Sequence, residues 1–211
     1  MTAVCAAIML SGMTAAKSQL LFNVSLNTSS LVGNPNGPFS LDFQLTDGSG
    51  TNDGNNTAII NNFQFGGGSP TGSPTLSGGG SGGLATAVTL SDSSFFNELL
   101  QGFTPGSLLS FDVNLSTNVD AGGTPDELSF AILDGLGNEI PTDGLGALFI
   151  VDVNTPSPDV QAFAANAPYE ALGSPRIVVA GQGVPEPGIA GLVMSLLAIA
   201  GPVAARRMSK S

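Results

Sequence analysis

Apolar and polar residues alternate with a period of two along most of this chain, and this pattern points to β-sheet. From Phe39 to Leu45, every second residue is apolar, and Ser40, Asp42 and Gln44 lie between. Successive side chains of a strand point to opposite faces, so each run predicts a strand with one face toward a core and one toward water. The runs cover residues 22–27, 39–45, 59–65, 84–90, 109–115, 128–132, 149–153 and 176–180.

Turn-forming residues separate these runs. Asn34–Gly37 reads Asn-Pro-Asn-Gly, and Asp-Gly pairs follow at Asp47-Gly48 and Asp134-Gly135. Asn, Asp, Gly and Pro favour the tight reversals that join antiparallel neighbours. About eight strands at this spacing predict an all-β fold, a jelly-roll-like antiparallel sandwich of two sheets, in which residues 17–183 form one domain.

Two stretches depart from the alternation. Between 94 and 103 the apolar residues fall on one face of a helix: Phe95, Phe96, Leu99, Leu100 and Phe103. With Ser91 or Asp92 as N-cap and Gly102 at the other end, this segment predicts one short helix, its apolar face packed on the core. Residues 66–83 are half glycine and predict a flexible loop between strands.

Residues 1–16 have the features of a secretory signal peptide. Val4–Leu10 is a short apolar run, and Thr14-Ala15-Ala16 offers small residues for cleavage. A buried first strand or helix is the alternative. Removal of a signal peptide would also remove Cys5, the only cysteine, and the mature protein would then have no disulfide.

The charge distribution excludes several function classes. Residues 18–183 carry fifteen acidic residues and one basic residue, Arg176, a formal charge of −14. Nucleic-acid binding needs patches of Lys and Arg, so this surface repels nucleic acid. The chain has no His, and without Cys5 it has no thiol. This excludes catalytic triads that depend on His or Cys, and metal sites built from imidazole or thiolate ligands. We therefore predict a protein that is not an enzyme and has no cofactor and no resident metal.

Carboxylates are the remaining candidates for chemistry. A glycosidase needs two facing carboxyl groups. Most acidic residues here, however, fall either in Asp-Gly turns or on the polar face of strands, as Asp42, Asp112 and Asp152 do, and the pattern names no pair. The segment 47–56 is rich in oxygen ligands suited to calcium, but it lacks the EF-hand spacing. A plain hydrophilic loop is the favoured interpretation.

The last 28 residues have three parts in fixed order. Val184-Pro185-Glu186-Pro187 is held extended by its prolines. Residues 188–205 are uncharged and mostly apolar, and as a helix they would reach about 27 Å, close to the ~30 Å of bilayer hydrocarbon. Arg206 and Arg207 then open the basic end 206–211 and would hold the C-terminus in the cytoplasm. Separately, these parts are typical of a linker, a core helix and a solvated end; together they predict a membrane-anchored tail.

In this order, residues 184–211 closely resemble the PEP-CTERM sorting signal of bacterial exported proteins. The resemblance implies that an exosortase, a membrane-embedded cysteine protease or transpeptidase, recognises Pro185-Glu186-Pro187 and removes the tail. It further implies an intermediate tethered to the inner membrane, which then passes to the cell surface or the exopolysaccharide matrix. Exosortase, the membrane and exopolysaccharide are the partners that follow from it.

The middle of the chain carries a second resemblance. I-N-N-F-Q-F at 60–65, a Gly-rich loop, and the segments 87–103, 109–115 and 128–134 are similar to a family of PEP-CTERM proteins that share an NFxF motif. That family implies a small exported β-rich domain without an assigned activity. The resulting prediction is a non-enzymatic surface or matrix protein, and the alternative is a carbohydrate-binding module assisted by calcium, a fold-level analogy.

Overall fold

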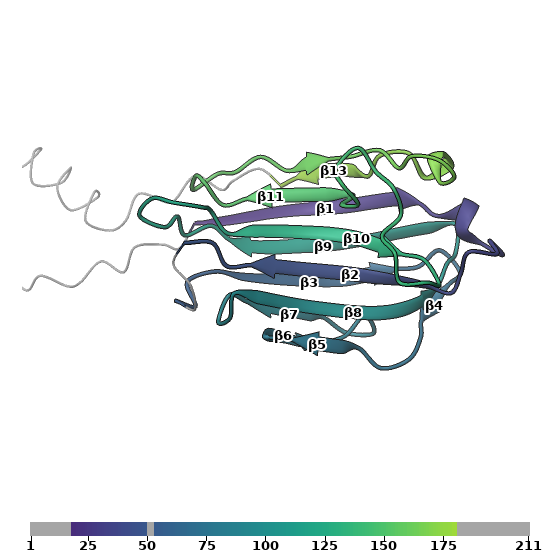
Figure 1. The fold of residues 1–211 in the computed structure, drawn as a ribbon, viewed down its shortest axis with the longest axis horizontal. Helices are drawn as coiled ribbons and strands as arrows, with labels where there is room; N and C mark the ends of the chain where they lie inside the picture. Colours follow the sequence, from purple (N-terminus) through teal and green to yellow (C-terminus); the bar gives the residue numbers. More distant parts are fainter. Residues whose placement is uncertain (1–17, 50–52, 181–211) are drawn as a thin grey trace, which may run out of the picture. The chain divides into compact units, whose positions relative to one another are not determined.

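Two antiparallel β-sheets face each other in the computed structural model, which describes residues 18–49 and 53–180 (Figure 1). Sheet A contains, in spatial order, β13 (Arg176–Val179), β1 (Gln19–Asn27), β9 (Leu108–Ser116), β3 (Thr57–Gln64), β7 (Val88–Ser91) and β6 (Gly79–Gly82). Sheet B contains β12 (Gln161–Ala162), β11 (Phe149–Asp152), β10 (Glu127–Leu133), β2 (Phe39–Thr46), β8 (Phe96–Thr104) and β4 (Ser69–Pro70), and β5 (Thr75–Ser77) also pairs with β8. The predicted all-β architecture of two antiparallel sheets is confirmed.

The strand predictions follow the alternation closely. All eight alternating runs overlap a described strand: β1, β2, β3, β7, β9, β10, β11 and β13. In β9 the burial pattern alternates residue by residue, with Leu109, Phe111, Val113 and Leu115 buried. The period-two pattern therefore located these eight strands and, in β9, the face that is buried.

Phenylalanine rings from both sheets form the centre of the core. Phe43 and Phe130 of sheet B stack with ring centroids 4.8 Å apart. Phe111 of sheet A meets both of them edge-on, at 5.3 and 5.2 Å. Burial of each such ring contributes roughly 1.5–3 kcal/mol, and the aromatic geometry adds to it. This layer joins the sheets without a disulfide in the described part of the chain.

The predicted helix at 94–103 is wrong: this segment forms strand β8. Asn97, Leu99, Gln101 and Phe103 point inward and are buried, so two polar residues lie on the core-facing side. The two polar residues hide the period-two pattern, and the apolar residues left over fall at helical spacing by chance. Pairing with β2 along eight residues then determines the strand conformation.

The polar inward residues of β8 bind backbone groups of the glycine-rich segment. Asn97 accepts a hydrogen bond from Gly79 N–H at 2.7 Å and donates to the carbonyl oxygen of Leu45 at 2.9 Å. Gln101 accepts from Leu84 N–H at 2.9 Å and donates to the carbonyl oxygen of Gly72 at 3.0 Å. Buried amides are tolerated where their donors and acceptors are satisfied in this way.

Residues 66–83, expected as a loop, instead contain the three short strands β4, β5 and β6. β5 pairs with β8 and β6 pairs with β7. A Cβ at Gly80 would clash with the carbonyl oxygen of Glu98, so glycine permits this close approach of backbones. The low complexity of the segment reflects tight packing between strands.

The NFxF motif has a structural role in β3. Asn62 adopts a positive φ of 56°, and the pairing register with β9 shifts between Asn61 and Gln64, which marks a β-bulge. Asn is one of the few residues that tolerate this conformation. Its side-chain amide donates to Asp112 at 2.7 Å, and Phe63 packs against Phe111 at 5.5 Å. The bulge therefore reorients the strand so that the motif's first phenylalanine reaches the core.

The predicted signal peptide (1–16) and sorting tail (184–211) lie outside the described residues. Within 18–49 and 53–180, no helix has the length and apolar character needed to cross a bilayer.

Candidate functional site

Four aspartates gather at one end of the sandwich, where strands of both sheets begin or end. Asp47 follows β2, Asp92 follows β7, and Asp126 precedes β10, while Asp120 lies in the connection from β9 to β10. The strand ends coincide because β2 pairs antiparallel with β10 and β7 pairs antiparallel with β3. We refer to Asp47, Asp92, Asp120 and Asp126 as the acidic end.

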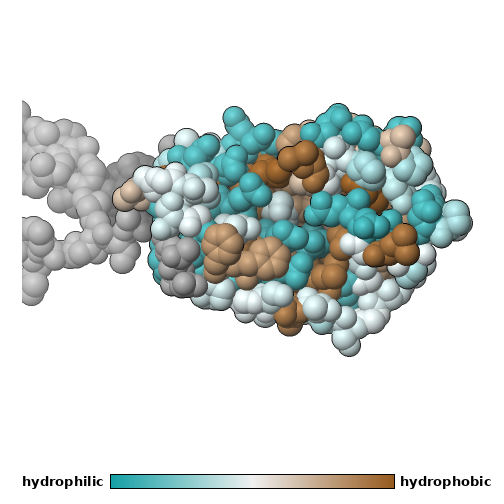
Figure 2. Space-filling model, viewed as in Figure 1, coloured by the Kyte–Doolittle hydropathy of each residue, from teal (hydrophilic) through white to brown (hydrophobic). Residues whose placement is uncertain are grey.

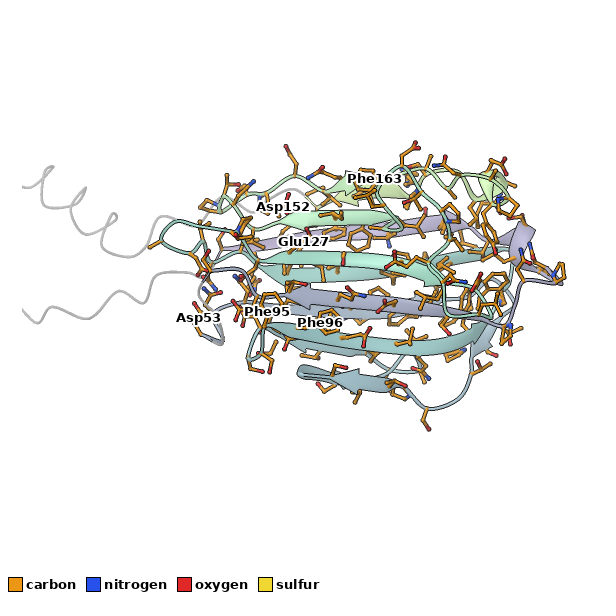
Figure 3. The ribbon with its side chains drawn as sticks, in the orientation of Figure 1. Asp53, Phe95, Phe96, Glu127, Asp152 and Phe163 are labelled. Carbon is orange, nitrogen blue, oxygen red and sulfur yellow. The ribbon has the colours of Figure 1, made fainter. Side chains whose placement is uncertain are left out.

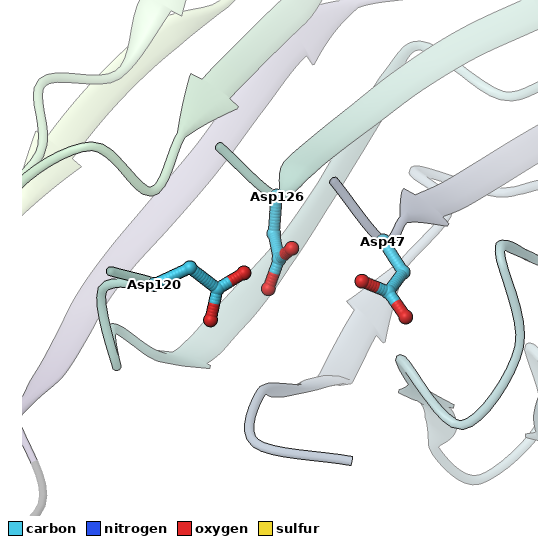
Figure 4. A group of neighbouring side chains, drawn as sticks. All are labelled: Asp47, Asp120 and Asp126. Carbon is cyan, nitrogen blue, oxygen red and sulfur yellow. The ribbon is translucent and has the colours of Figure 1, made fainter. Parts of the chain in front are cut away.

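Three of these carboxylates converge on one point. Oxygen atoms of Asp47, Asp120 and Asp126 all lie within 4.8 Å of one another, and Figure 4 shows the side chains directed toward a common space. Asp47 and Asp126 are 0 and 2 % exposed. Oxygen groups in this arrangement can hold a hard cation such as calcium.

Two asparagines, Asn55 and Asn56, donate hydrogen bonds to carboxylates of the acidic end. The Asn56 side-chain amide donates to Asp126 at 2.7 Å, and the Asn56 backbone N–H donates to Asp92 at 2.7 Å. The Asn55 side-chain amide donates to Asp120 at 2.6 Å. The residues just before β3 therefore connect the acidic residues that follow β7 and β9.

Several oxygens at this end are enclosed without a donor. One side-chain oxygen each of Asp92, Asp120 and Asn55 has no hydrogen-bond partner among the described residues, although water does not reach it. Buried polar atoms in proteins are nearly always paired, because an unpaired one retains its full desolvation cost. All three atoms are acceptors, so each has the capacity to bind a donor or a cation.

The electrostatics agree with that description. Burial raises the pKa of Asp92 to about 7, the Asn56 N–H opposes this, and the charges of Asp126, Asp53 and Asp47 raise it further. Arg176 is the only basic residue between positions 18 and 183, and it lies on β13 at an edge of sheet A. The described part of the chain thus offers this end no basic side chain from a neighbouring strand.

A second group of functional side chains crosses the outer face of sheet B. Asp152, Glu127, Thr46 and Phe96 lie directly opposite one another on the adjacent strands β11, β10, β2 and β8. We refer to this line as the cross-strand row. Figure 3 shows its carboxylates and Phe96 on the same face, with Phe95 beside Phe96. Figure 2 shows that apolar patches on this face are separated by hydrophilic surface.

The row borders a shallow cleft of about 380 Å³ that Asp47 also lines. Phe95 is 60 % exposed and Phe96 38 %, which is high for rings of this size. Burial, and secondarily the charge of Asp152, raises the pKa of Glu127. Aromatic faces beside carboxylates can bind a ligand that has both apolar and hydroxyl surfaces.

Asp42 lies on the same face of sheet B, but the prediction that it is solvated is wrong. It is 3 % exposed, and burial raises its pKa to about 7, against the hydrogen bond that Gln44 donates at 2.6 Å. Glu98 and Glu139 raise the pKa further. Alternation placed Asp42 on the outer face correctly; the tertiary fold covers that face at this position.

Of the residues predicted to act, few fall in the described part of the chain. The sorting residues Val184–Pro187, Arg206 and Arg207 lie outside it. The segment 47–56, considered for calcium, does contribute Asp47, but its partners Asp120 and Asp126 come from another connection. Asp92 had been considered only as a helix cap. The available signal was positional, since Asp47, Asp92 and Asp126 each adjoin the end of an alternating run.

In comparisons with known proteins, no family model, no curated protein and no solved structure matches this chain.

Proposed function

We propose that this chain is an exported, non-enzymatic protein of the bacterial cell surface or extracellular matrix. Residues 1–16 direct export, residues 17–183 form the exported domain, and residues 184–211 act as a PEP-CTERM signal that an exosortase processes. The observation that carries the proposal is the order of parts in the tail. Val184-Pro185-Glu186-Pro187 precedes an uncharged apolar run, and Arg206 and Arg207 follow it.

The described domain is consistent with a cargo of this kind. The last described strand, β13, ends at Val179, so all described strands precede the sorting motif. The phenylalanine layer supplies a core that does not depend on a disulfide. The acidic composition of residues 18–183 favours solubility outside the cell.

Mass spectrometry of the native C-terminus tests the sorting step. The protein is recovered from membrane, surface and medium fractions of its host, together with a variant in which Pro185-Glu186-Pro187 is replaced by three alanines. We expect the wild type to lose the tail near Glu186 and the variant to keep it. Retention of Arg206–Ser211 by the wild-type protein in the inner membrane would contradict the proposal.

The cross-strand row favours carbohydrate binding as a second candidate function. Sugar rings present apolar C–H faces, which stack on aromatic side chains, and hydroxyls, which donate to carboxylates. Phe95 and Phe96 provide the first surface, and Glu127 and Asp152 provide the second. The neighbouring cleft lies where β2, β8 and β10 meet their connections, and Phe95, Glu127 and Asp152 line it.

Affinity electrophoresis in gels that contain the host exopolysaccharide tests this second function. We expect Phe95→Ala and Phe96→Ala each to reduce retardation several-fold. The matched control is Leu136→Ala, because Leu136 is 87 % exposed and lies in a turn away from the row. Equal migration of all four proteins with and without polymer would exclude the site. Release of reducing sugar that depends on Glu127 would instead contradict the non-enzymatic proposal.

A further inference from the structure

We propose that the acidic end is a binding site for one calcium ion, held by carboxylate oxygens of Asp47, Asp120 and Asp126. The site is independent of the sorting tail, and it adjoins the cross-strand row, because Asp47 also lines the cleft that the row borders. It lies between the connection that follows β2 and the connection that precedes β10, so the ion links segments that pass between the two sheets.

The spacing of the carboxylates fits one ion. Calcium takes oxygen ligands at about 2.3–2.6 Å, so two ligands on opposite sides of it are roughly 4.6–5.2 Å apart, and others are closer. The oxygens of Asp47, Asp120 and Asp126 are all within 4.8 Å of one another. The three side chains therefore reach a common point without a change of backbone.

Asp92 provides a second observation that favours a cation at this end. It is 0 % exposed, one of its oxygens has no partner, and the other is bound by Asn56 N–H. Asn56 also holds Asp126, and Asp126 is the charge that affects Asp92 most. A wholly buried carboxylate beside this cluster is stable where a positive charge compensates it.

Further unpartnered oxygens surround the same place. One oxygen of Asp120 and the side-chain oxygen of Asn55 are enclosed without a donor, and Asn55 itself donates to Asp120. Amide and carboxylate oxygens together are the ligand types of protein calcium sites. Surface acids are normally solvated, whereas these acceptors are enclosed.

The ligand chemistry selects calcium among common ions. The ligand set contains only oxygen, which disfavours zinc and copper, ions that prefer imidazole or thiolate ligands. Magnesium gives up its water shell reluctantly, and two of the three carboxylates here are buried. Sodium and potassium carry half the charge of calcium and so compensate the three carboxylates less well.

Thermal unfolding with and without calcium tests the site. The intact chain, purified in detergent and treated with a chelator, is melted with millimolar calcium or magnesium. We expect calcium to raise Tm by about 5 °C or more, and magnesium to raise it less. Isothermal titration should give one calcium per chain. No heat and no change in Tm would overturn the proposal.

Two isosteric variants locate the ion. Asp120→Asn keeps the size of the side chain and removes one ligand charge, and it should abolish at least nine-tenths of the calcium-induced rise in Tm. Asp143→Asn is the matched control, because Asp143 likewise accepts a side-chain amide hydrogen bond, from Asn166 at 3.0 Å, but lies outside the acidic end. It should respond as the wild type does. An unchanged response of Asp120→Asn would overturn the assignment.

If Asp120→Asn does not fold, the metal content of the wild type decides. Protein dialysed against calcium and then desalted should contain one calcium per chain by elemental mass spectrometry. A calcium content at the level of the buffer would overturn the proposal.

Discussion

The phenylalanine layer and the acidic end are both buried, but they are assembled in opposite ways. The phenylalanine layer is built from inward-facing residues of long alternating strands. Its residues can therefore be recognised from the local sequence pattern. The acidic end takes single aspartates from different connections of the chain. Asp47 and Asp126, which lie farthest apart in the sequence, are separated by 79 positions. The difference shows that a core can follow from periodicity, whereas a polar site depends on which strand ends the topology brings together.

Removing a ring from the core should have the largest effect. Phe130 stacks on Phe43 at 4.8 Å and also contacts Phe111 and Phe149. Phe130→Ala leaves a cavity between the sheets and should lower the free energy of unfolding by about 3–5 kcal/mol. Urea denaturation measures this, and Leu136→Ala, on the exposed turn, should change it by less than about 0.5 kcal/mol. A loss below about 1 kcal/mol for Phe130→Ala would contradict the packing described.

Substitution of Asn97, on the core-facing side of β8, should reduce stability nearly as much. Asn97→Leu keeps a similar size but leaves Gly79 N–H and the Leu45 carbonyl without their partner. We expect the free energy of unfolding to fall by about 2–4 kcal/mol, since buried unpaired groups keep their desolvation cost. Hydrogen exchange should show Gly79 N–H losing protection first. A variant as stable as the wild type would contradict a stabilising role for these two hydrogen bonds.

The acidic end should respond to pH in a direction opposite to that of a salt-bridged acid. The pKa of Asp92 is raised from 3.8 to about 7, so the folded state binds its proton more tightly than the unfolded state. The free energy of unfolding therefore falls as pH rises from about 4 to about 7. In chelator-treated protein, Asp92→Asn should raise the free energy of unfolding by about 1–3 kcal/mol at pH 8. At pH 4 the same substitution should change the free energy of unfolding little.

Denaturation at both pH values measures this effect. Asp143→Asn serves as control, because Asp143 is an exposed aspartate outside the acidic end. An equal effect of Asp92→Asn at pH 4 and pH 8 would show that the side chain titrates normally.

Substitutions of Asn62 in the β3 bulge should have the smallest effect on stability. They distinguish the contribution of its backbone conformation from that of its hydrogen bond to Asp112. Asn62→Ala places a poorly suited residue at a φ of 56° and removes the hydrogen bond to Asp112, so it should cost about 1–2 kcal/mol. Asn62→Gly removes the same bond but accepts the backbone, so it should cost about half as much. Thermal melting distinguishes the two, and equal losses would mean that the bond alone matters.

The burial of side chains was predictable in strands where apolar and polar residues alternate strictly. In β9 alternation named the buried face residue by residue, because one side of the strand meets only apolar neighbours. In β2 it named the core-facing residues but not the burial of Asp42 on the other face. In β8 the same reasoning failed, because Asn97 and Gln101 are satisfied by the backbone of a distant glycine-rich segment. No local pattern contains that partner.

Sequence alone determined the eight alternating strands, the turns, the acidic balance and the tripartite order of the tail, because each depends on neighbours within a few residues. Tertiary structure decided that Asp42 is covered, that the glycine-rich segment joins both sheets, and that Asp47, Asp120 and Asp126 converge. These features depend on which strands become neighbours in space. A pairing such as β2 with β10 joins residues about ninety positions apart, and it is selected by burial of the whole core rather than by any local preference.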